Sequence, residues 1–180
     1  MELALSLRAE LELGRQVGYL TLGDSMTYST NGYLITALRE IYPQLRHRTY
    51  AGITSFAAIA AHFDWPLGEG KERVLLLPCP EEMPALRADI LTHDLVVLMK
   101  IGRRLPQVLV LLEELRITEN CVFAQRLGFA EERTSRGLAD LPRDTETGYL
   151  STMLIRREAH QPRHQLSTRP LGEILSEPTG

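Results

Sequence analysis

The sequence predicts an α/β fold in which helices pack on the faces of a sheet. Short apolar runs of strand length lie at residues 73–77, 94–99 and 121–125. Longer segments between them, at 81–91 and 105–115, have the length and composition of helices. Strands that alternate with helices of this length are typical of a sheet covered by helices.

The first part of the chain alternates in the same way. Residues 1–13 place leucines between glutamates and Arg8 at helical spacing, and Gly14 ends the predicted helix. A short apolar strand is predicted at 15–22, a helix at 29–40 and another short strand at 48–51. The α/β pattern therefore extends over both halves of the sequence.

Two further elements complete the pattern. Thr54 is a suitable N-cap for a helix at 55–63, because its hydroxyl can accept from the first free amides. The last predicted strand covers residues 149–157. We expect three parts: a partial N-terminal α/β domain at 1–51, a C-terminal α/β domain at 52–157 and a flexible tail at 158–180.

Composition excludes several classes of protein. A net charge of −3 argues against general nucleic-acid binding, which needs a basic excess to neutralise phosphates. No apolar run approaches the length that spans a bilayer and no signal peptide is evident, so we expect no membrane association and a cytoplasmic location. Cys79 and Cys121 have apolar neighbours, which predicts buried free thiols. The pair His160 and His164 has helical spacing, but Pro162 between them disfavours a metal site.

Candidate ligand loops follow the predicted strands, where open α/β sheets gather ligands. The Gly23-Asp24 turn and the start of the helix after Gly52 are two such loops, and Lys100 and Arg126 begin two others. Structural turns and helix caps use the same residue types, and a lysine at the end of a strand is usually a surface residue. Each loop taken alone leaves a structural role and a binding role open.

Taken together and in order, these segments resemble the tetrapyrrole methylase family over residues 14–157. The segment Leu20-Thr-Leu-Gly-Asp-Ser-Met-Thr-Tyr-Ser-Thr30 is similar to the family's Gly-Asp-Pro loop and to its continuation in the C20-methylating branch. Gly52-Ile-Thr-Ser-Phe-Ala-Ala-Ile-Ala-Ala61 resembles a second motif of that branch. The strand that ends at Lys100 and the loop Ala130-Glu-Glu-Arg133 complete the series.

The resemblance implies the class III fold of S-adenosylmethionine (SAM)-dependent methyltransferases, with SAM between two α/β domains. Carried over by position, it implies SAM-binding residues in the first loop, at the helix start and after two strands. These are Gly23, Asp24, Met26, Tyr28, Ser29, Thr54, Ser55, Met99 and Leu127. Lys100 is a feature of the C20 branch without an assigned role.

The implied reaction is methyl transfer from SAM to C20 of precorrin-2 or its cobalt form in cobalamin biosynthesis. Asp24 and Tyr28 are candidates for the base that collects the C20 proton. The substrate is rich in carboxylates, which planar guanidinium groups can bind in pairs. We expect substrate contacts from arginines that follow strand ends: Arg103, Arg104, Arg126 and Arg133. No metal ligand set is expected.

Two features depart from the family pattern. Ser25 stands where the family has proline, so the loop loses a fixed φ angle. Family members also begin with a strand and a Gly-x-Gly-Pro-Gly loop, and the similarity here starts after them. We therefore expect a truncated N-terminal domain, and a homodimer or a separately encoded N-terminal segment as partner. Two alternatives remain: an inactive or split-gene fragment of such an enzyme, which binds SAM or tetrapyrrole without turnover, and a tetrapyrrole methylase that acts at another ring position.

Overall fold

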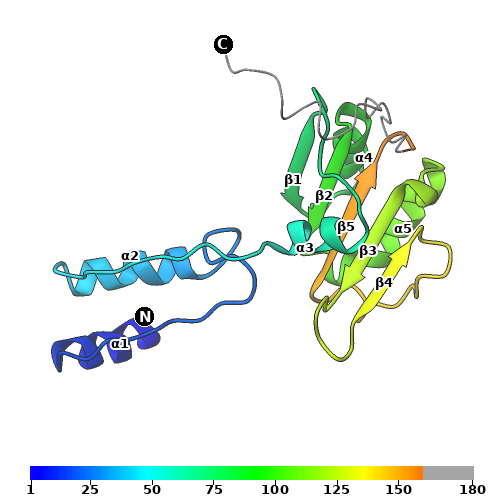
Figure 1. Ribbon diagram of the computed structural model, residues 1–180. Helices are drawn as coiled ribbons and strands as arrows, with labels where there is room; N and C mark the ends of the chain where they lie inside the picture. The colour runs from blue at the N-terminus through cyan, green and yellow to red at the C-terminus, as the bar shows by residue number, and fades with distance from the viewer. Residues whose placement is uncertain (160–180) are drawn as a thin grey trace, which may run out of the picture.

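The computed structural model describes residues 1–159, which form two helices followed by a helix-covered sheet (Figure 1). The helices are α1 (Glu2–Glu12), α2 (Asn31–Ile41), α3 (Ser55–His62), α4 (Met83–Thr92) and α5 (Leu105–Glu114), with short 3-10 turns η1 (Gly102–Arg104) and η2 (Thr118–Asn120). The strands are β1 (Val74–Pro78), β2 (Leu95–Met99), β3 (Cys121–Gln125), β4 (Arg133–Arg136) and β5 (Ser151–Arg156).

The five strands form one mixed sheet in the order β1-β2-β5-β3-β4. Strands β1 and β2 run parallel, whereas β5 is antiparallel to both of its neighbours, β2 and β3. Strand β5 is the last strand within residues 1–159 and lies in the middle of the sheet, so its side chains are buried on both faces. The predicted α/β class is confirmed.

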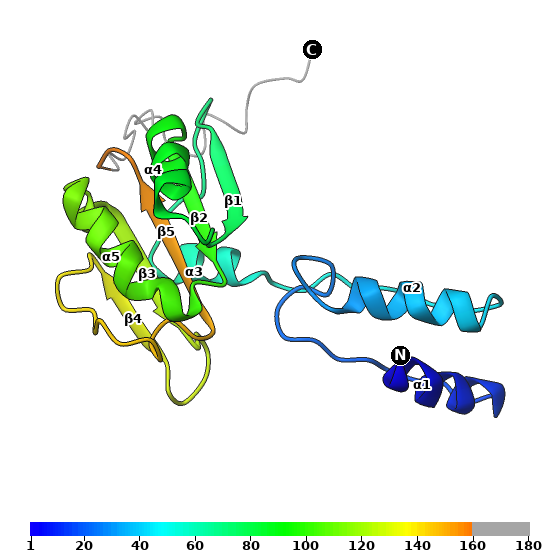
Figure 2. The same ribbon diagram turned by 180° about the vertical axis from the view of Figure 1, so that it is seen from behind.

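Two hydrophobic cores cover the two faces of the sheet. Alternate residues of β2 illustrate the division: Val96 and Leu98 pack with the residues of α4 and α5, whereas Val97 and Met99 pack with α3. Figure 2 shows α4 and α5 together on one face and α3 near the other. This alternation follows from the period of two in a strand, and it gives both faces of the sheet an apolar cover.

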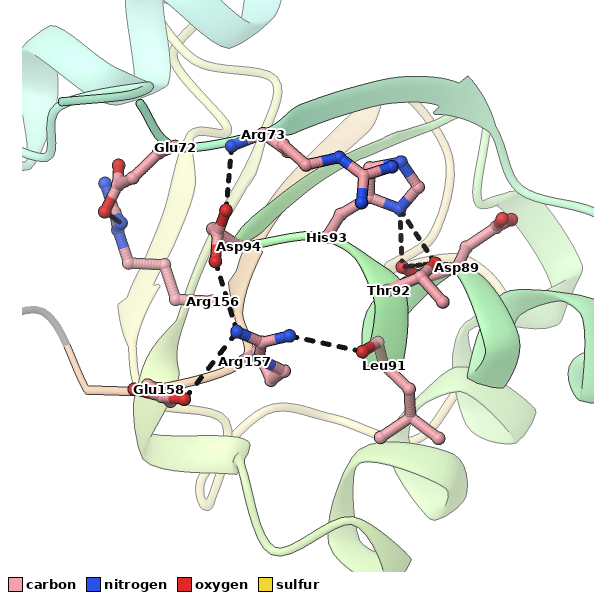
Figure 3. Close-up of polar contacts among 10 residues, drawn as sticks. All are labelled: Glu72, Arg73, Asp89, Leu91, Thr92, His93, Asp94, Arg156, Arg157 and Glu158. Atoms are coloured by element: carbon pink, nitrogen blue, oxygen red, sulfur yellow. Dashed lines mark hydrogen bonds and ion pairs between the residues drawn. The ribbon is translucent and has the colours of Figure 1, made fainter. Parts of the chain in front are cut away.

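The edge of the sheet at which β2 begins is closed by ion pairs and hydrogen bonds (Figure 3). The Asp94 carboxylate accepts from the Arg73 backbone N–H at 2.8 Å and contacts the Arg157 guanidinium at 3.2 Å. Beside it, Arg156 is buried and donates to the Glu72 carboxylate at 2.8 Å. These contacts join the ends of β1, β2 and β5, so this edge has a structural role.

Most predicted elements match the structure within a few residues; two predicted strands are absent, and one strand was not predicted. The predicted strands at 15–22 and 48–51 are wrong: both segments are irregular and form no ladder. A strand needs a hydrogen-bonded neighbour, and within residues 1–159 neither segment has one. Strand β4 was not predicted, because Arg-Thr-Ser-Arg has no apolar pattern and forms by pairing with β3.

Other sequence predictions concern the cysteines, the C-terminal segment and the membrane. Cys79 and Cys121 are buried free thiols, as predicted, and burial raises the pKa of each. From residue 160 onward, the predicted flexible tail and the His160/His164 pair lie outside the described residues. Within residues 1–159 no helix is long and apolar enough to cross a membrane.

Candidate functional site

The candidate site lies at the edge of the sheet opposite Asp94, where β2 and β3 end and β5 begins. Register brings Met99 of β2 and Ala124 of β3 to either side of Thr152 in β5. All three side chains lie on the α3 face, because Val97, Val122 and Leu154 of the same alternation belong to the α3-side core. The edge thus brings together residues from three strands and the start of α3.

Backbone strain gathers at this edge. Three non-glycine residues next to strand ends have a positive φ: Lys100 at 54°, Arg126 at 50° and Leu150 at 51°. Tyr28, in the predicted cofactor loop, has a φ of 50°. Left-handed backbone costs free energy in residues with a Cβ and tends to persist at functional sites. The clustering marks this edge of the sheet as a candidate binding site.

The start of α3 presents polar groups to this edge. The Thr54 hydroxyl accepts from the Ala57 backbone N–H at 3.2 Å, which caps the helix as the sequence predicted. The exposed Ser55 hydroxyl accepts from the Thr152 hydroxyl at 2.9 Å and lies 3.9 Å from the Met99 sulfur. Because the first amides of a helix have no intrahelical acceptor, this helix start can donate to a ligand.

Asp24 joins the two predicted cofactor loops. One carboxylate oxygen accepts from the Gly52 backbone N–H at 2.9 Å, and the other accepts from the Met26 N–H at 3.0 Å and the Thr27 hydroxyl at 2.8 Å. These donors, the Gly52 amide foremost, lower the pKa of Asp24. Asp24 is therefore ionised at neutral pH and fixes the position of its loop.

The same two loops touch through glycines. A Cβ built on Gly52 would lie 2.1 Å from the Gly23 carbonyl oxygen and 3.2 Å from the Asp24 Cα. Since no side chain fits at that distance, residue 52 must be glycine for the loops to approach. Gly23 has a φ of 72°, a conformation that glycine adopts without steric cost.

The other predicted cofactor residues lie around these loops. Met26 and Tyr28 are exposed, at 60% and 49%, and present apolar surface beside Asp24. The Ser29 hydroxyl accepts from the Asn31 backbone N–H at 3.2 Å, at the start of α2. Leu127, which follows β3, packs against the α3-side core. The predicted residues thus lie on the two linked loops, on α3 and at the edge of the sheet.

The four predicted substrate arginines differ in their contacts. Arg104 forms an ion pair with Glu81 and donates to the Lys100 carbonyl at 3.2 Å. Arg133 donates to the buried Thr147 hydroxyl at 2.8 Å, which ties β4 to the segment before β5. Arg126 lies 3.9 Å from Glu131. Arg103 is exposed, and no ion pair or hydrogen bond of its side chain is found within residues 1–159.

Sequence reasoning did not find the residues that hold the segment before β5. The buried Gln125 amide donates to the carbonyls of Glu146 and Tyr149, at 2.9 and 3.1 Å. Gly148 crosses Gly102 so closely that a Cβ would lie 1.8 Å from the Gly102 carbonyl oxygen. The signals available were a glutamine at the end of an apolar strand and a glycine in a polar loop, and both are too common to single out.

The arrangement suits a ligand that has both polar and apolar parts. Hydroxyl and amide donors lie at the start of α3, and exposed apolar side chains lie on the neighbouring loop. Within residues 1–159 no group of histidine, cysteine and acidic residues could hold a metal ion. The donors and the exposed apolar side chains are suited to binding and aligning a ligand by hydrogen bonds and apolar contacts.

Comparison with known proteins assigns a family. The family model for tetrapyrrole (corrin/porphyrin) methylases matches residues 1–142. The chain is 32% identical over 162 residues to the cobalt-precorrin-2 C(20)-methyltransferase of Salmonella typhimurium, covering 87% of this chain and 65% of that protein. It is 26% identical over 152 residues to the precorrin-2 C(20)-methyltransferase of a Sinorhizobium species, covering 84% and 60%. The chain thus spans less than two thirds of the length of these relatives.

Solved structures agree on the fold. The cobalt-precorrin-4 methyltransferase CbiF superposes with a TM-score of 0.67 at 17% identity, covering 86% of this chain and 70% of that one. The uroporphyrin-III C-methyltransferase of Thermus thermophilus, solved with S-adenosylhomocysteine, gives 0.58 at 17% identity, covering 86% and 72%. Together with the matched family model, these likenesses show that the chain belongs to the tetrapyrrole methylase family, with its class III methyltransferase fold.

Proposed function

We propose that this chain takes part in SAM-dependent methyl transfer to C20 of precorrin-2 or cobalt-precorrin-2, in cobalamin biosynthesis. One observation supports the cofactor site above others: the Gly23-Asp24 loop contacts Gly52, and Ser55, three residues after Gly52, contacts Met99 at the edge of the sheet. The names of the curated relatives supply the acceptor and the position of methylation.

In this function the protein binds SAM and the tetrapyrrole and aligns them with each other. Thr54 and Ser55 offer hydroxyls and helix-start amides to the polar groups of the cofactor, while Met26 and Tyr28 cover its apolar parts. SAM supplies a methyl group on an electrophilic sulfonium, and the reduced tetrapyrrole is itself nucleophilic. Acceleration then comes chiefly from holding the two reactants in line and from excluding water.

The two candidate bases are unequal. Asp24 already accepts three hydrogen bonds, and its lowered pKa makes it a poor proton acceptor. We therefore assign Asp24 to holding the two loops together. Tyr28 is half exposed in the same loop and stays the candidate for contact with the reacting centre.

Arg103 is the best placed of the four arginines to bind a substrate carboxylate, because its exposed guanidinium has no protein partner within residues 1–159. Replacement of Arg103 by alanine should raise KM more than it lowers kcat. Arg116→Ala, an exposed arginine after α5, is the matched control and should change neither constant. A fall in kcat with unchanged KM for Arg103→Ala would contradict substrate binding by this residue.

We also propose that the active assembly has a further component, either a second copy or a separately encoded N-terminal segment. The exposed apolar side chains of residues 1–53, among them Leu20 at 92% and Ile53 at 73%, support this proposal. A chain that binds the cofactor without turnover is the second candidate function, and the same exposed surface favours it.

Calorimetric titration with S-adenosylhomocysteine tests the cofactor site. Wild type should bind with one-site saturation. Gly52→Ala should weaken binding about tenfold or more, because its Cβ would displace the Gly23 backbone. Gly32→Ala is the matched control, since its Cβ would meet nothing within 4 Å, and it should bind as wild type.

Absence of binding by a folded wild-type chain would contradict a cofactor site formed by this chain alone. If binding is seen, precorrin-2 and its cobalt form should be supplied together with SAM, and the product analysed by mass spectrometry and NMR. Methylation at C20 is expected. Methylation at another position would instead indicate a tetrapyrrole methylase of different regiochemistry. Binding without product would favour a chain that binds the cofactor without turnover.

A further inference from the structure

Thr152 is a polar residue in an apolar part of the sheet. It lies in β5 between Met99 and Ala124 on the α3 face, with Leu154 next along that face, and it is only 6% exposed. Valine has nearly the same shape and would fill the same space. Burial of a hydroxyl costs free energy unless it is hydrogen-bonded, so the contact made by this hydroxyl is informative.

The Thr152 hydroxyl donates to the Ser55 hydroxyl across 97 positions of sequence, at 2.9 Å. Ser55 is the first residue of α3 and is itself exposed, whereas Thr152 is buried beneath it. This bond therefore connects the middle strand of the sheet to the helix start that faces the candidate site.

The direction of the bond sets what Ser55 can do. A serine hydroxyl has one proton and two lone pairs. When Ser55 accepts from Thr152, its own proton stays available for donation. Within residues 1–159 the neighbour toward which it donates is the Met99 sulfur at 3.9 Å, a weak acceptor that a ligand oxygen or nitrogen can replace.

We propose that Thr152 is a positioning residue of the cofactor site, which holds the Ser55 hydroxyl as a donor toward a polar acceptor atom of the bound nucleoside. The inference rests on the proposed function in one respect, namely that the ligand at the start of α3 is SAM or S-adenosylhomocysteine. Thr152 does not contact the ligand in this proposal and acts through Ser55.

Titration of the full chain with S-adenosylhomocysteine tests the proposal, with thermal unfolding of each variant as a check of folding. Thr152→Val keeps the shape and removes the donor, and it should weaken binding about five- to tenfold. Thr152→Ser restores the hydroxyl and should bind within about twofold of wild type. Ser151→Ala is the matched control, because this neighbouring buried hydroxyl donates to the Gly148 carbonyl instead.

A double-mutant cycle separates positioning from general loosening of the sheet. Ser55→Ala should weaken binding, and adding Thr152→Val to it should change the affinity by less than about twofold, since the hydroxyl to be positioned is gone. Equal affinity of wild type and Thr152→Val would overturn the proposal, as would an undiminished effect of Thr152→Val on the Ser55→Ala background.

Two remaining outcomes are also decisive. If Thr152→Val does not fold, the comparison of Thr152→Ser with Thr152→Ala replaces it, and failure of serine to bind better than alanine overturns the proposal. If wild type does not bind the ligand, the proposed cofactor site itself fails and this inference with it. Binding by wild type with no difference among the variants removes only the role of Thr152.

Discussion

The N-terminal body (residues 1–53) and the sheet body (residues 54–157) bury their apolar side chains to very different extents. In the N-terminal body only Ala4, Asn31 and Leu38 are buried. In the sheet body every residue of β2, β3 and β5 is buried. Figure 1 shows α1 and α2 as a pair beside the sheet, in contact mainly with each other.

The difference shows what a sheet supplies that two helices do not. Strand β5 pairs on both sides and is covered on both faces, so its backbone and side chains leave water together. In the N-terminal body, the irregular segments at 15–22 and 45–53 pair with no strand within residues 1–159. Between them and the helices lies a cavity of about 330 Å³, lined by residues such as Leu11, Val17 and Leu38.

Amide hydrogen exchange should give the largest contrast between the two bodies. Amides of β2 and β5 should exchange at least about 10³-fold more slowly than those of residues 15–22 and 45–51, because strand amides open only with global or sub-global unfolding. Mass spectrometry of peptic peptides measures both regions in one experiment.

Comparable amide protection in the two regions would contradict the predicted difference between the N-terminal body and the sheet body. A concentration series then identifies the cause: protection that rises with protein concentration would indicate pairing of the N-terminal body with a second copy.

Paired leucine-to-alanine substitutions should give the next largest effect. Leu98 of β2 is fully buried, and Leu98→Ala should destabilise the chain by about 2–5 kcal/mol, from lost burial and the cavity left behind. Leu20 is 92% exposed, and Leu20→Ala should change stability by less than about 0.5 kcal/mol. Urea unfolding followed by circular dichroism measures both; equal effects would mean that Leu20 is covered in solution.

The smallest effect concerns pH and the edge of the sheet at Glu72. The hydrogen bond from Arg156 lowers the pKa of Glu72 from its ordinary value of 4.5. The contribution of the Glu72 carboxylate to stability is therefore complete above pH 4.5, and it is lost as pH falls through the lower folded-state pKa. Glu72→Gln should cost about 1–3 kcal/mol at pH 7 and flatten the dependence on pH below 4.5.

The control for this substitution is Glu131→Gln, because Glu131 is exposed and lies 3.9 Å from Arg126. It should change stability by less than about 0.5 kcal/mol and leave the acid limb unchanged. If the stability of Glu72→Gln falls below pH 4.5 as steeply as that of wild type, another group causes the dependence on pH.

Local pattern was sufficient for the helices and for the four apolar strands of the sheet, β1, β2, β3 and β5. Three features depend on residues that are neighbours in sequence, which a sequence displays directly. They are the Thr54 cap, the alternation of strands and helices around β2, and the motif loops at Gly23 and Gly52. The family resemblance rested on the same loops and is confirmed by the matched family model.

Which segments pair as strands could not be predicted from local pattern. The segment at 15–22 has the apolar content of a strand, yet it is irregular, because within residues 1–159 it pairs with no strand. The polar segment β4 is a strand because it pairs with β3. The place of β5 between β2 and β3 likewise depends on contacts between distant residues.

The sequence by itself determined the α/β class, the two loops that start with glycine and the cap of α3, because turn geometry and helix capping are local. Only the tertiary structure decided that Asp24 fixes Gly52, that Arg133 holds Thr147 and that Thr152 reaches Ser55. Each of these contacts joins residues between 14 and 97 positions apart, and a local sequence pattern does not display contacts across such separations.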